Sequence, residues 1–261
     1  MGNKYLKSYT RFVKNSLAVD MEYRAGFLFK NITGLVWVIG ALFLINVIFS
    51  QSSSVAGWTK QQVTCLYLTF SIAVDAFYIF VRDNLRKFLN LIRDGQLDAY
   101  LLKPINLRFL VTFMSNQMGY YVLFRFFAAI ILLIVYSPTS NIFNWSLYIS
   151  FTIIGSIGVY SAVFILHTFN FWLIRLENIT ELSNQSYELA KVPIDAWPKQ
   201  IQLFLTYAFP ITVLSSFAVN ALFGKAGVIQ LLLSVIVSTI LYFISDKFWN
   251  FALRHYSSAS S

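Results

Sequence analysis

Long apolar runs, separated by short polar stretches, constrain this chain more than any other feature of its sequence. Several runs approach or exceed the roughly 20 residues that a helix needs to cross a hydrocarbon core of about 30 Å. Only 12% of the 261 residues are charged, whereas a soluble domain carries about 25%. The sequence therefore predicts an all-α polytopic membrane protein, and it excludes a water-soluble enzyme.

Five stretches have the length and composition of membrane-spanning helices. They are residues 27–50, 62–81, part of 109–136, part of 145–174, and 228–249. Basic residues indicate the orientation, because Lys and Arg are enriched on the cytoplasmic side of membranes. Residues 1–26 carry five Lys or Arg, the 82–108 interval carries six, and the loop between the first two spans carries one. We therefore expect the N-terminus and this interval in the cytoplasm.

The segment 176–222 allows two arrangements. In the first, 201–222 is a fifth span that is kinked at Pro210. In the second, 176–194 is a polar fifth span sheltered by protein, and 197–222 is a pair of re-entrant half-helices entered from outside. Both arrangements give six spans with both termini in the cytoplasm.

Three acidic residues of this segment share one helical face, because Glu177, Glu181 and Glu188 recur at spacings of 4 and 7. If the segment enters the membrane, this stripe must face a cavity or a partner, since a charge at mid-membrane costs several kcal/mol. The stripe and Pro210 are then candidates for a transport pathway. If the segment stays in the cytoplasm, the stripe is an ordinary solvated acidic face. The sequence leaves both interpretations open.

The polar interval 82–104 contains an amphipathic helix. The basic residues of this helix lie largely off its apolar face. That face is formed by Leu85, Phe88, Leu89 and Ile92. The interval is too polar to cross a membrane. We expect its helix to lie on the membrane surface or to dock into a partner, and the alternative is a solvated loop helix.

The net charge of +9 points to membranes rather than to nucleic acid, because the basic residues flank the apolar runs. In residues 1–26, a basic stripe runs beside an aromatic one, which predicts an interfacial helix at an anionic leaflet. Cys65 is the only cysteine, so no disulfide can form within the chain. Membrane lipids are therefore the partners that the charge pattern predicts.

No pattern in the sequence predicts a catalytic centre, an ATP-binding loop or a metal site. Ionisable residues inside the predicted spans are the remaining candidates for function. Asp75 and Arg125 lie in neighbouring spans and can form an ion pair, with either a packing role or a role in transport. His167 lies near the inner end of the fourth span, where we expect an interhelical hydrogen bond.

Two stretches resemble a known family. Residues 93–106, RDGQLDAYLLKPIN, look like the RxGxLDxYLLKPxN signature of type-2 ABC exporter permeases, within a bacterial subgroup of uncharacterised ABC-type permeases. Residues 254–260, RHYSSAS, are similar to the RxYxSAS ending of that subgroup. Phe171 with Trp172, and the Pro210 segment, also lie where the family places such residues. The resemblance covers essentially the whole chain.

The resemblance implies a single permease domain, residues 1–261, in the bacterial inner membrane. Such permeases pair with a second copy or a paralogue and bind a cytoplasmic ABC ATPase dimer, which carries the ATP and Mg²⁺, so no cofactor is expected in this chain. Residues 82–104 are then the coupling helix that contacts the ATPase, and 176–194 is the fifth span. From the amphipathic pattern we infer which residues make this contact: an apolar centre of Leu85, Phe88, Leu89 and Ile92, and a polar rim of Arg86, Arg93 and Asp94.

The function that this resemblance implies is ATP-driven export, and the apolar, aromatic spans suit an amphipathic or lipid-like substrate. One alternative is an ion-coupled secondary transporter, in which Asp75, Arg125 and the acidic stripe relay an ion. Another alternative is a membrane scaffold subunit. The sequence does not identify the substrate, and it does not distinguish a homodimer from a heterodimer.

Overall fold

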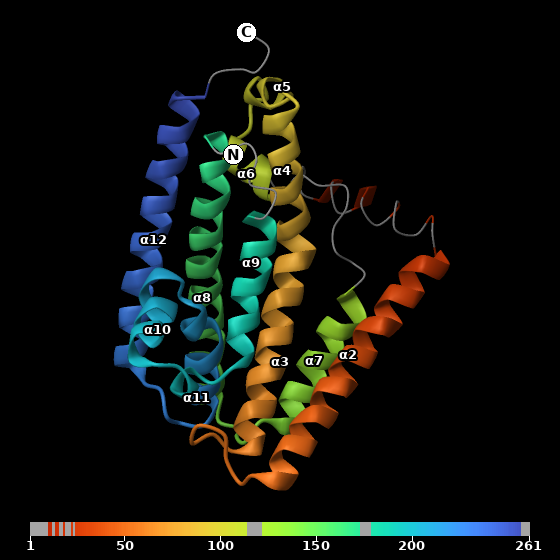
Figure 1. The fold of residues 1–261 in the computed structure, drawn as a ribbon, viewed down its shortest axis with the longest axis vertical. Coiled ribbons are helices and arrows are strands. Elements are labelled where there is room, and N and C mark those ends of the chain that lie inside the picture. The colour runs from red at the N-terminus through yellow and green to blue at the C-terminus, as the bar shows by residue number, and fades with distance from the viewer. Residues whose placement is uncertain are drawn as a thin grey trace.

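The computed structural model describes residues 24–113, 122–172 and 179–256, together with positions 10, 11, 14, 15, 18 and 22 (Figure 1). Within these ranges the chain is helical, and its one extended contact is an isolated bridge between Val55 and Trp58. Most of segment 1–26 lies outside the described residues, so the interfacial helix stays a prediction.

The helices run between two ends of the molecule, one marked by α5 and the other by the loop between α2 and α3 (Figure 1). The first half of the chain forms α2 (Arg24–Gln51), α3 (Lys60–Phe77), η1 (Tyr78–Arg82), α4 (Asp83–Arg93), α5 (Asp98–Leu101), α6 (Leu107–Phe113) and α7 (Leu123–Tyr136). The second half forms α8 (Ile142–Thr168), η3 (Phe169–Phe171), α9 (Ile179–Glu188), η4 (Leu189–Lys191), η5 (Ile194–Ala196), α10 (Lys199–Leu203), η6 (Phe204–Ala208), η7 (Val213–Phe217), α11 (Ala218–Leu222) and α12 (Val228–Arg254).

The long apolar helices confirm an all-α polytopic membrane protein. By length and composition, four described helices can cross a membrane: Arg24–Gln51, Lys60–Ile92, Ile142–Phe171 and Val228–Arg254. A bent pair, Lys199–Ala208 with Val213–Leu222, is a fifth candidate if its halves count as one span. Of the third predicted span, the described residues include most of α6 and the short apolar helix α7.

The second span and the amphipathic helix after it form one continuous rod, α3–η1–α4. The residues at both junctions, Phe77 and Asp83, keep right-handed helical backbone angles, and the π-helical turn η1 lies between them. The 33 residues of Lys60–Ile92, at about 1.5 Å per residue, extend roughly 50 Å, well beyond a hydrocarbon core of about 30 Å. α4 therefore continues along the axis of the span, which corrects our expectation of a separate helix on the membrane surface.

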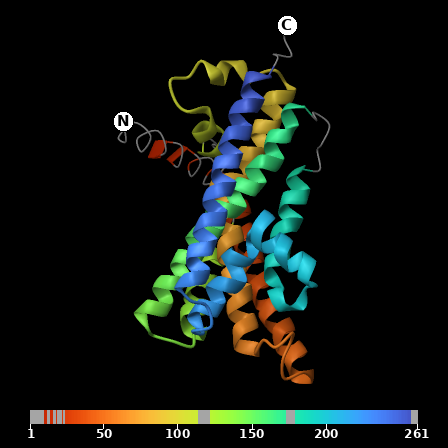
Figure 2. The same cartoon turned by 90° about the vertical axis from the view of Figure 1, so that its left-hand side faces the viewer.

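α8 packs along α12 on one side and against the bent pair on another (Figure 2). Two glycines of α8 permit the second contact. A Cβ atom built on Gly155 would lie 2.4 Å from the backbone nitrogen of Leu214, and one built on Gly158 would lie 2.6 Å from Cγ of Pro210. Because real Cβ atoms do not approach other atoms so closely, glycine is required at both positions.

The bent pair enters and leaves the helix bundle at the end opposite α5 (Figure 1). Its halves meet at 85° around Pro210. Just before the pair, a carboxylate oxygen of Asp195 accepts a hydrogen bond of 2.8 Å from the indole N–H of Trp58, which precedes α3. Just after the pair, Leu222 joins the apolar cluster that contains Trp58. This geometry favours the second arrangement, in which 197–222 forms re-entrant half-helices and α9 belongs to the fifth span.

Candidate functional site

Asp75 on α3 and Arg125 on α7 form a closed ion pair between two helices. Nε of Arg125 lies 2.9 Å from each carboxylate oxygen of Asp75, and a terminal guanidinium nitrogen contacts the same carboxylate. Asp75 has no exposed surface, and a Cβ atom built on Gly34 of α2 would lie 3.4 Å from Cβ of Arg125. Both carboxylate oxygens of Asp75 therefore accept hydrogen bonds from Arg125, and the ion pair holds α3 and α7 together.

Asn31 on α2 caps the start of α7 from a neighbouring helix. Its side-chain oxygen accepts a hydrogen bond of 3.0 Å from the backbone N–H of Phe124, and its amide nitrogen donates to the carbonyl of Phe27, also at 3.0 Å. The first N–H groups of a helix lack partners within it, so this contact satisfies one of them. Our sequence analysis missed Asn31, although a polar side chain inside the first apolar run is a usable signal.

A second arginine, Arg108 on α6, lies inside the helix bundle near the α5 end. Its guanidinium donates hydrogen bonds to Asp246 at 3.2 Å and to Ser245 at 2.7 Å, both on α12. It also lies over the rings of Phe164 and Tyr242, at 4.5 Å and 4.7 Å from their centroids. In the sequence, Arg108 was recognised only as one of the basic residues that flank spans. The signal that could have identified the pair is an arginine and an aspartate at the inner ends of two different spans.

A cavity of about 580 Å³ lies beside Arg108 and Asp246, between α3, η1, α6, α8 and α12. Most of its walls are apolar, and its buried floor is formed by Phe77, Tyr187 and Leu214. Pockets that bind small molecules are commonly about 300–1,000 Å³ and mostly apolar, with a few polar groups. The cavity is therefore a candidate ligand site that the sequence did not predict.

His167 is buried in α8, with 2% of its surface exposed. Its Nδ1 atom lies 3.0 Å from the carbonyl oxygen of Val163, one turn earlier in the same helix. The side-chain amide of Asn170 donates a hydrogen bond of 2.9 Å to the carbonyl of His167. These hydrogen bonds join residues of one continuous stretch, whereas we expected a bond between two helices.

The predicted acidic stripe lies on the surface of α9 where the structure describes it. Glu181 and Glu188 are exposed, and Glu177 lies outside the described residues. Glu188 forms an ion pair with Lys191, and Glu181 accepts a hydrogen bond of 3.2 Å from the amide of Gln185. Neither glutamate is among the residues that line the cavity beside Arg108.

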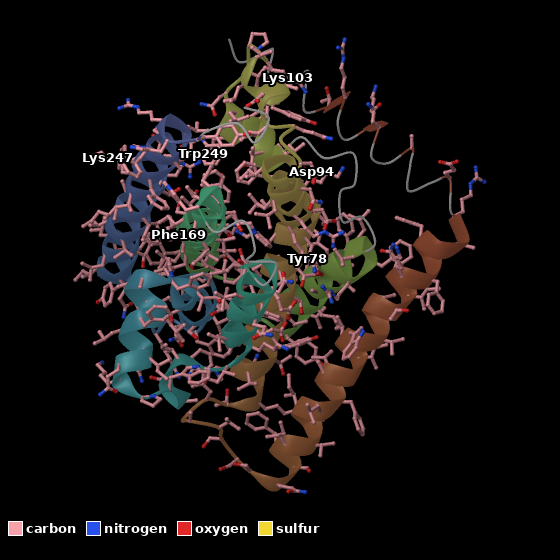
Figure 3. All side chains as sticks on the ribbon, turned by 45° about the horizontal axis from the view of Figure 1, so that its top comes forward. Tyr78, Asp94, Lys103, Phe169, Lys247 and Trp249 are labelled. Carbon is pink, nitrogen blue, oxygen red and sulfur yellow. The ribbon has the colours of Figure 1, made fainter. Side chains whose placement is uncertain are left out.

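The apolar face of α4 is buried in the chain's own helix bundle. Leu85, Phe88 and Ile92 are at most 5% exposed. The ring centroid of Phe88 lies 5.6 Å from that of Phe171 and 5.3 Å from that of Trp249. Figure 3 shows Trp249 on the side of α12 that faces α4, and Lys247 on the opposite side. The three apolar residues would have to leave the core to reach an ATPase, which corrects their assignment to that contact.

The other residues assigned to the ATPase contact lie at or near the surface. Arg86 and Asp94 are exposed, Leu89 is half-buried, and the side chain of Arg93 lies outside the described part of the chain. The most exposed apolar side chain near them is Leu102, just after α5, at 87%. Sequence periodicity missed Leu102 because it lies outside the amphipathic helix.

The described residues contain no group of three or more His, Cys, Asp or Glu that could hold a metal ion. The fold and its interior polar groups define a class, that of multi-pass helical membrane proteins with a cavity between the helices. A comparison with protein families matches residues 35–260 to the ABC-2 family transporter protein. The chain belongs to this family, whose members are membrane-spanning permease subunits of ABC transporters and are not themselves catalytic. A search of curated proteins found no match.

Proposed function

We propose that this chain is the permease subunit of an ATP-driven exporter, which moves an amphipathic or lipid-like substrate out of the cytoplasm. The observation that carries the proposal is the family match over residues 35–260. In this proposal the chain lies in the bacterial inner membrane and pairs with a second copy or a paralogue. Two cytoplasmic ATPase subunits bind the pair and supply the ATP and Mg²⁺.

The proposed topology has six crossings with both termini in the cytoplasm. The crossings are α2, the α3–η1–α4 rod, α6 with α7, α8, α9 with its 3₁₀ turns, and α12. The bent pair is re-entrant from the outer side. The distribution of charge supports this orientation, since α4, α5 and the C-terminal end of α12 share one end of the molecule (Figure 1). The basic residues in or beside these helices are Arg86, Lys87, Arg93, Lys103, Lys247 and Arg254.

The ATPase contact lies at the α5 end, on a surface different from the one that the amphipathic pattern indicated. Leu101 and Leu102 are 46% and 87% exposed there, between charged residues. Exposed apolar side chains inside a polar surface are typical of protein contacts. We assign the centre of the contact to these two leucines, with Arg86 and Asp94 at its rim. Figure 3 shows Lys103, the next residue after Leu102, at this outermost part of the molecule.

The buried face of α4 gives the contact a mechanical role. A push on α5 passes into α4, which packs through Phe88 against Trp249 on α12. The same rod continues into α3, which is tied to α7 by Asp75 and Arg125. ATP-driven movement of the ATPase subunits therefore acts on three spans at once, and their rearrangement releases the substrate outward.

Replacement of Leu102 by Asp tests the proposal, because it places a charge at the centre of the ATPase contact without disturbing the core. We expect loss of co-purification with the ATPase subunit that carries a P-loop. Ile142→Asp is the matched control, since Ile142 is 83% exposed and lies at the opposite end of the molecule. Cys65 is buried at 0% exposure, so a thiol that stays unreactive shows that each variant is folded.

If the folded Leu102→Asp variant co-purifies with the ATPase as well as the wild type does, the ATPase contact does not lie at the α5 end. Failure of the wild-type chain to co-purify with any P-loop ATPase would overturn the proposed function itself. Phe88→Asp serves as a contrast, because a charge in the buried aromatic cluster should expose Cys65 rather than act at the surface.

A further inference from the structure

The cavity beside Arg108 has a buried floor and a mouth on the flank of the helix bundle. Its floor residues Phe77, Tyr187 and Leu214 are at most 8% exposed. Phe80 and Ile157, which also line the cavity, are 39% and 44% exposed. These two apolar side chains lie on membrane-crossing helices. The mouth therefore opens toward hydrocarbon, and molecules of the bilayer have direct access to it.

The two charged groups of this cavity and one side-chain amide gather at one end. Arg108 and Asn106 come from the start of α6, and Asp246 lies in the last third of α12, so all three are toward the α5 end. Away from that end, the exposed lining residue Ser156 donates its hydroxyl to the carbonyl of Thr152 within α8, at 2.7 Å. The Thr112 hydroxyl is paired with the Tyr160 hydroxyl at 2.8 Å, and the remaining lining residues are aliphatic or aromatic. This mostly apolar chamber, with charged groups at one end, complements an amphiphile.

Arg108 retains donors that can serve a ligand. An arginine has five N–H donors, and Arg108 gives one each to the Tyr160 hydroxyl, Asp246 and Ser245. Five less three leaves two N–H groups without a partner among the described residues, although the side chain is only 9% exposed. Buried donors without acceptors are unfavourable, so a ligand oxygen at this position is favoured.

We infer that this cavity binds a phospholipid-like amphiphile from the cytoplasmic leaflet, with its chain in the apolar chamber and its phosphate at Arg108. A guanidinium group matches the geometry of phosphate oxygens and binds them more strongly than neutral acceptors. Asp246 competes with the phosphate for the guanidinium, and its half-exposed side chain (46%) can move toward water when a ligand enters. The inference rests on the proposed function, because the bound amphiphile is then the exporter's cargo.

Binding is measured on the purified permease without ATPase, in an uncharged detergent. Phosphatidylglycerol is the probe, diacylglycerol with the same acyl chains is the headgroup control, and bound molecules are counted by native mass spectrometry. We expect phosphatidylglycerol to be retained and diacylglycerol to bind about tenfold more weakly, the scale of one lost hydrogen bond to a charged group. Excess inorganic phosphate should not displace the lipid, because it has no chain to fill the chamber.

Two pairs of variants separate the chamber from the charged end. Ala76 lines the chamber, so Ala76→Trp should fill it and abolish retention of the lipid. Gly40→Trp is the control, since nothing lies within 4 Å of a Cβ atom there. Arg108→Gln should weaken binding about tenfold. Lys247→Gln should not, because Lys247 is exposed and is not among the residues that line the cavity.

Asp246→Asn distinguishes a binding role of Arg108 from a purely structural one. Removal of the competing carboxylate should tighten phosphatidylglycerol binding, the opposite of the effect of Arg108→Gln. A structural ion pair would give losses of the same sign in both variants. If Arg108→Gln does not fold, Asp246→Asn and Ala76→Trp still provide the test.

Weaker binding in Asp246→Asn, equal retention by Ala76→Trp and Gly40→Trp, or equal binding of diacylglycerol would each overturn the inference. Displacement of the lipid by inorganic phosphate alone would show an anion site without a lipid chamber and would overturn it as well. Since no ATPase is present, these failures differ from a failure of the proposed function, which appears as loss of co-purification with the ATPase.

Discussion

The two arginines inside the helix bundle hold their charge in different ways. Arg125 faces a carboxylate with no exposed surface, and both oxygens of Asp75 are engaged. Arg108 shares only one contact with the half-exposed Asp246 and rests on aromatic rings. The first pair is closed and joins two spans. The second lines a cavity, so an arginine at a span end can belong to a candidate ligand site as well as to the basic residues that flank a membrane.

The largest effect expected from this comparison is that of Asp75→Ala. Removal of the carboxylate leaves Arg125 as an uncompensated buried charge, which typically destabilises a protein by about 3–5 kcal/mol. Thermal unfolding, followed through the reactivity of the buried Cys65 thiol, measures the loss. An unchanged unfolding temperature would show that the pair is not the tie between α3 and α7 that its geometry indicates.

The double variant Asp75→Leu with Arg125→Met should recover most of that loss. Replacement of a buried ion pair by apolar residues of similar volume is often neutral or stabilising by about 1–4 kcal/mol. The same thiol assay, with the single Asp75→Ala variant beside it, measures the recovery. If the double variant is as unstable as the single one, the two charges do more than balance each other, and a role in transport regains support.

The smallest effect on stability is expected for Asp246→Ala. Its half-exposed carboxylate resembles a surface ion pair, whose contribution is about 0–1 kcal/mol. The unfolding temperature should stay close to that of the wild type, in contrast to Asp75→Ala. A loss as large as that of Asp75→Ala would mean that Arg108 also depends on a closed pair, and the distinction between the two arginines would disappear.

The fold class could be predicted from the sequence because membrane insertion depends on a local property, the length of an apolar run. The first and last runs, 27–50 and 228–249, correspond closely to α2 and α12. The residues against which the apolar face of α4 packs could not be predicted in this way. The positions of Leu85, Phe88 and Ile92 show that one face of a helix is buried, but not which residues cover it. In this structure Trp249, near the C-terminal end of the sequence, is one of the residues that pack against this face.

The two ion pairs show that the candidate site, too, could be predicted only in part from the sequence. Asp75 and Arg125 were recognisable because each lies inside an apolar run, where a charge requires a partner. Arg108 and Asp246 lie at span ends, where charges are ordinary, and 138 residues separate them in sequence. Only the three-dimensional fold brings these two side chains together. The cavity between them results from the shapes of several helices, for which a single sequence offers no local signal.

The π-helical turn η1, Tyr78–Arg82, has a consequence for how the rod is built. Such a turn accommodates an additional residue relative to an α-helix, and each residue rotates a helix by about 100°. η1 thus sets the rotation of α4, which carries Phe88, relative to α3, which carries Asp75. Deletion of one residue there would leave the sequence of α4 unchanged, yet it would rotate the apolar face of α4 by about 100° away from α12.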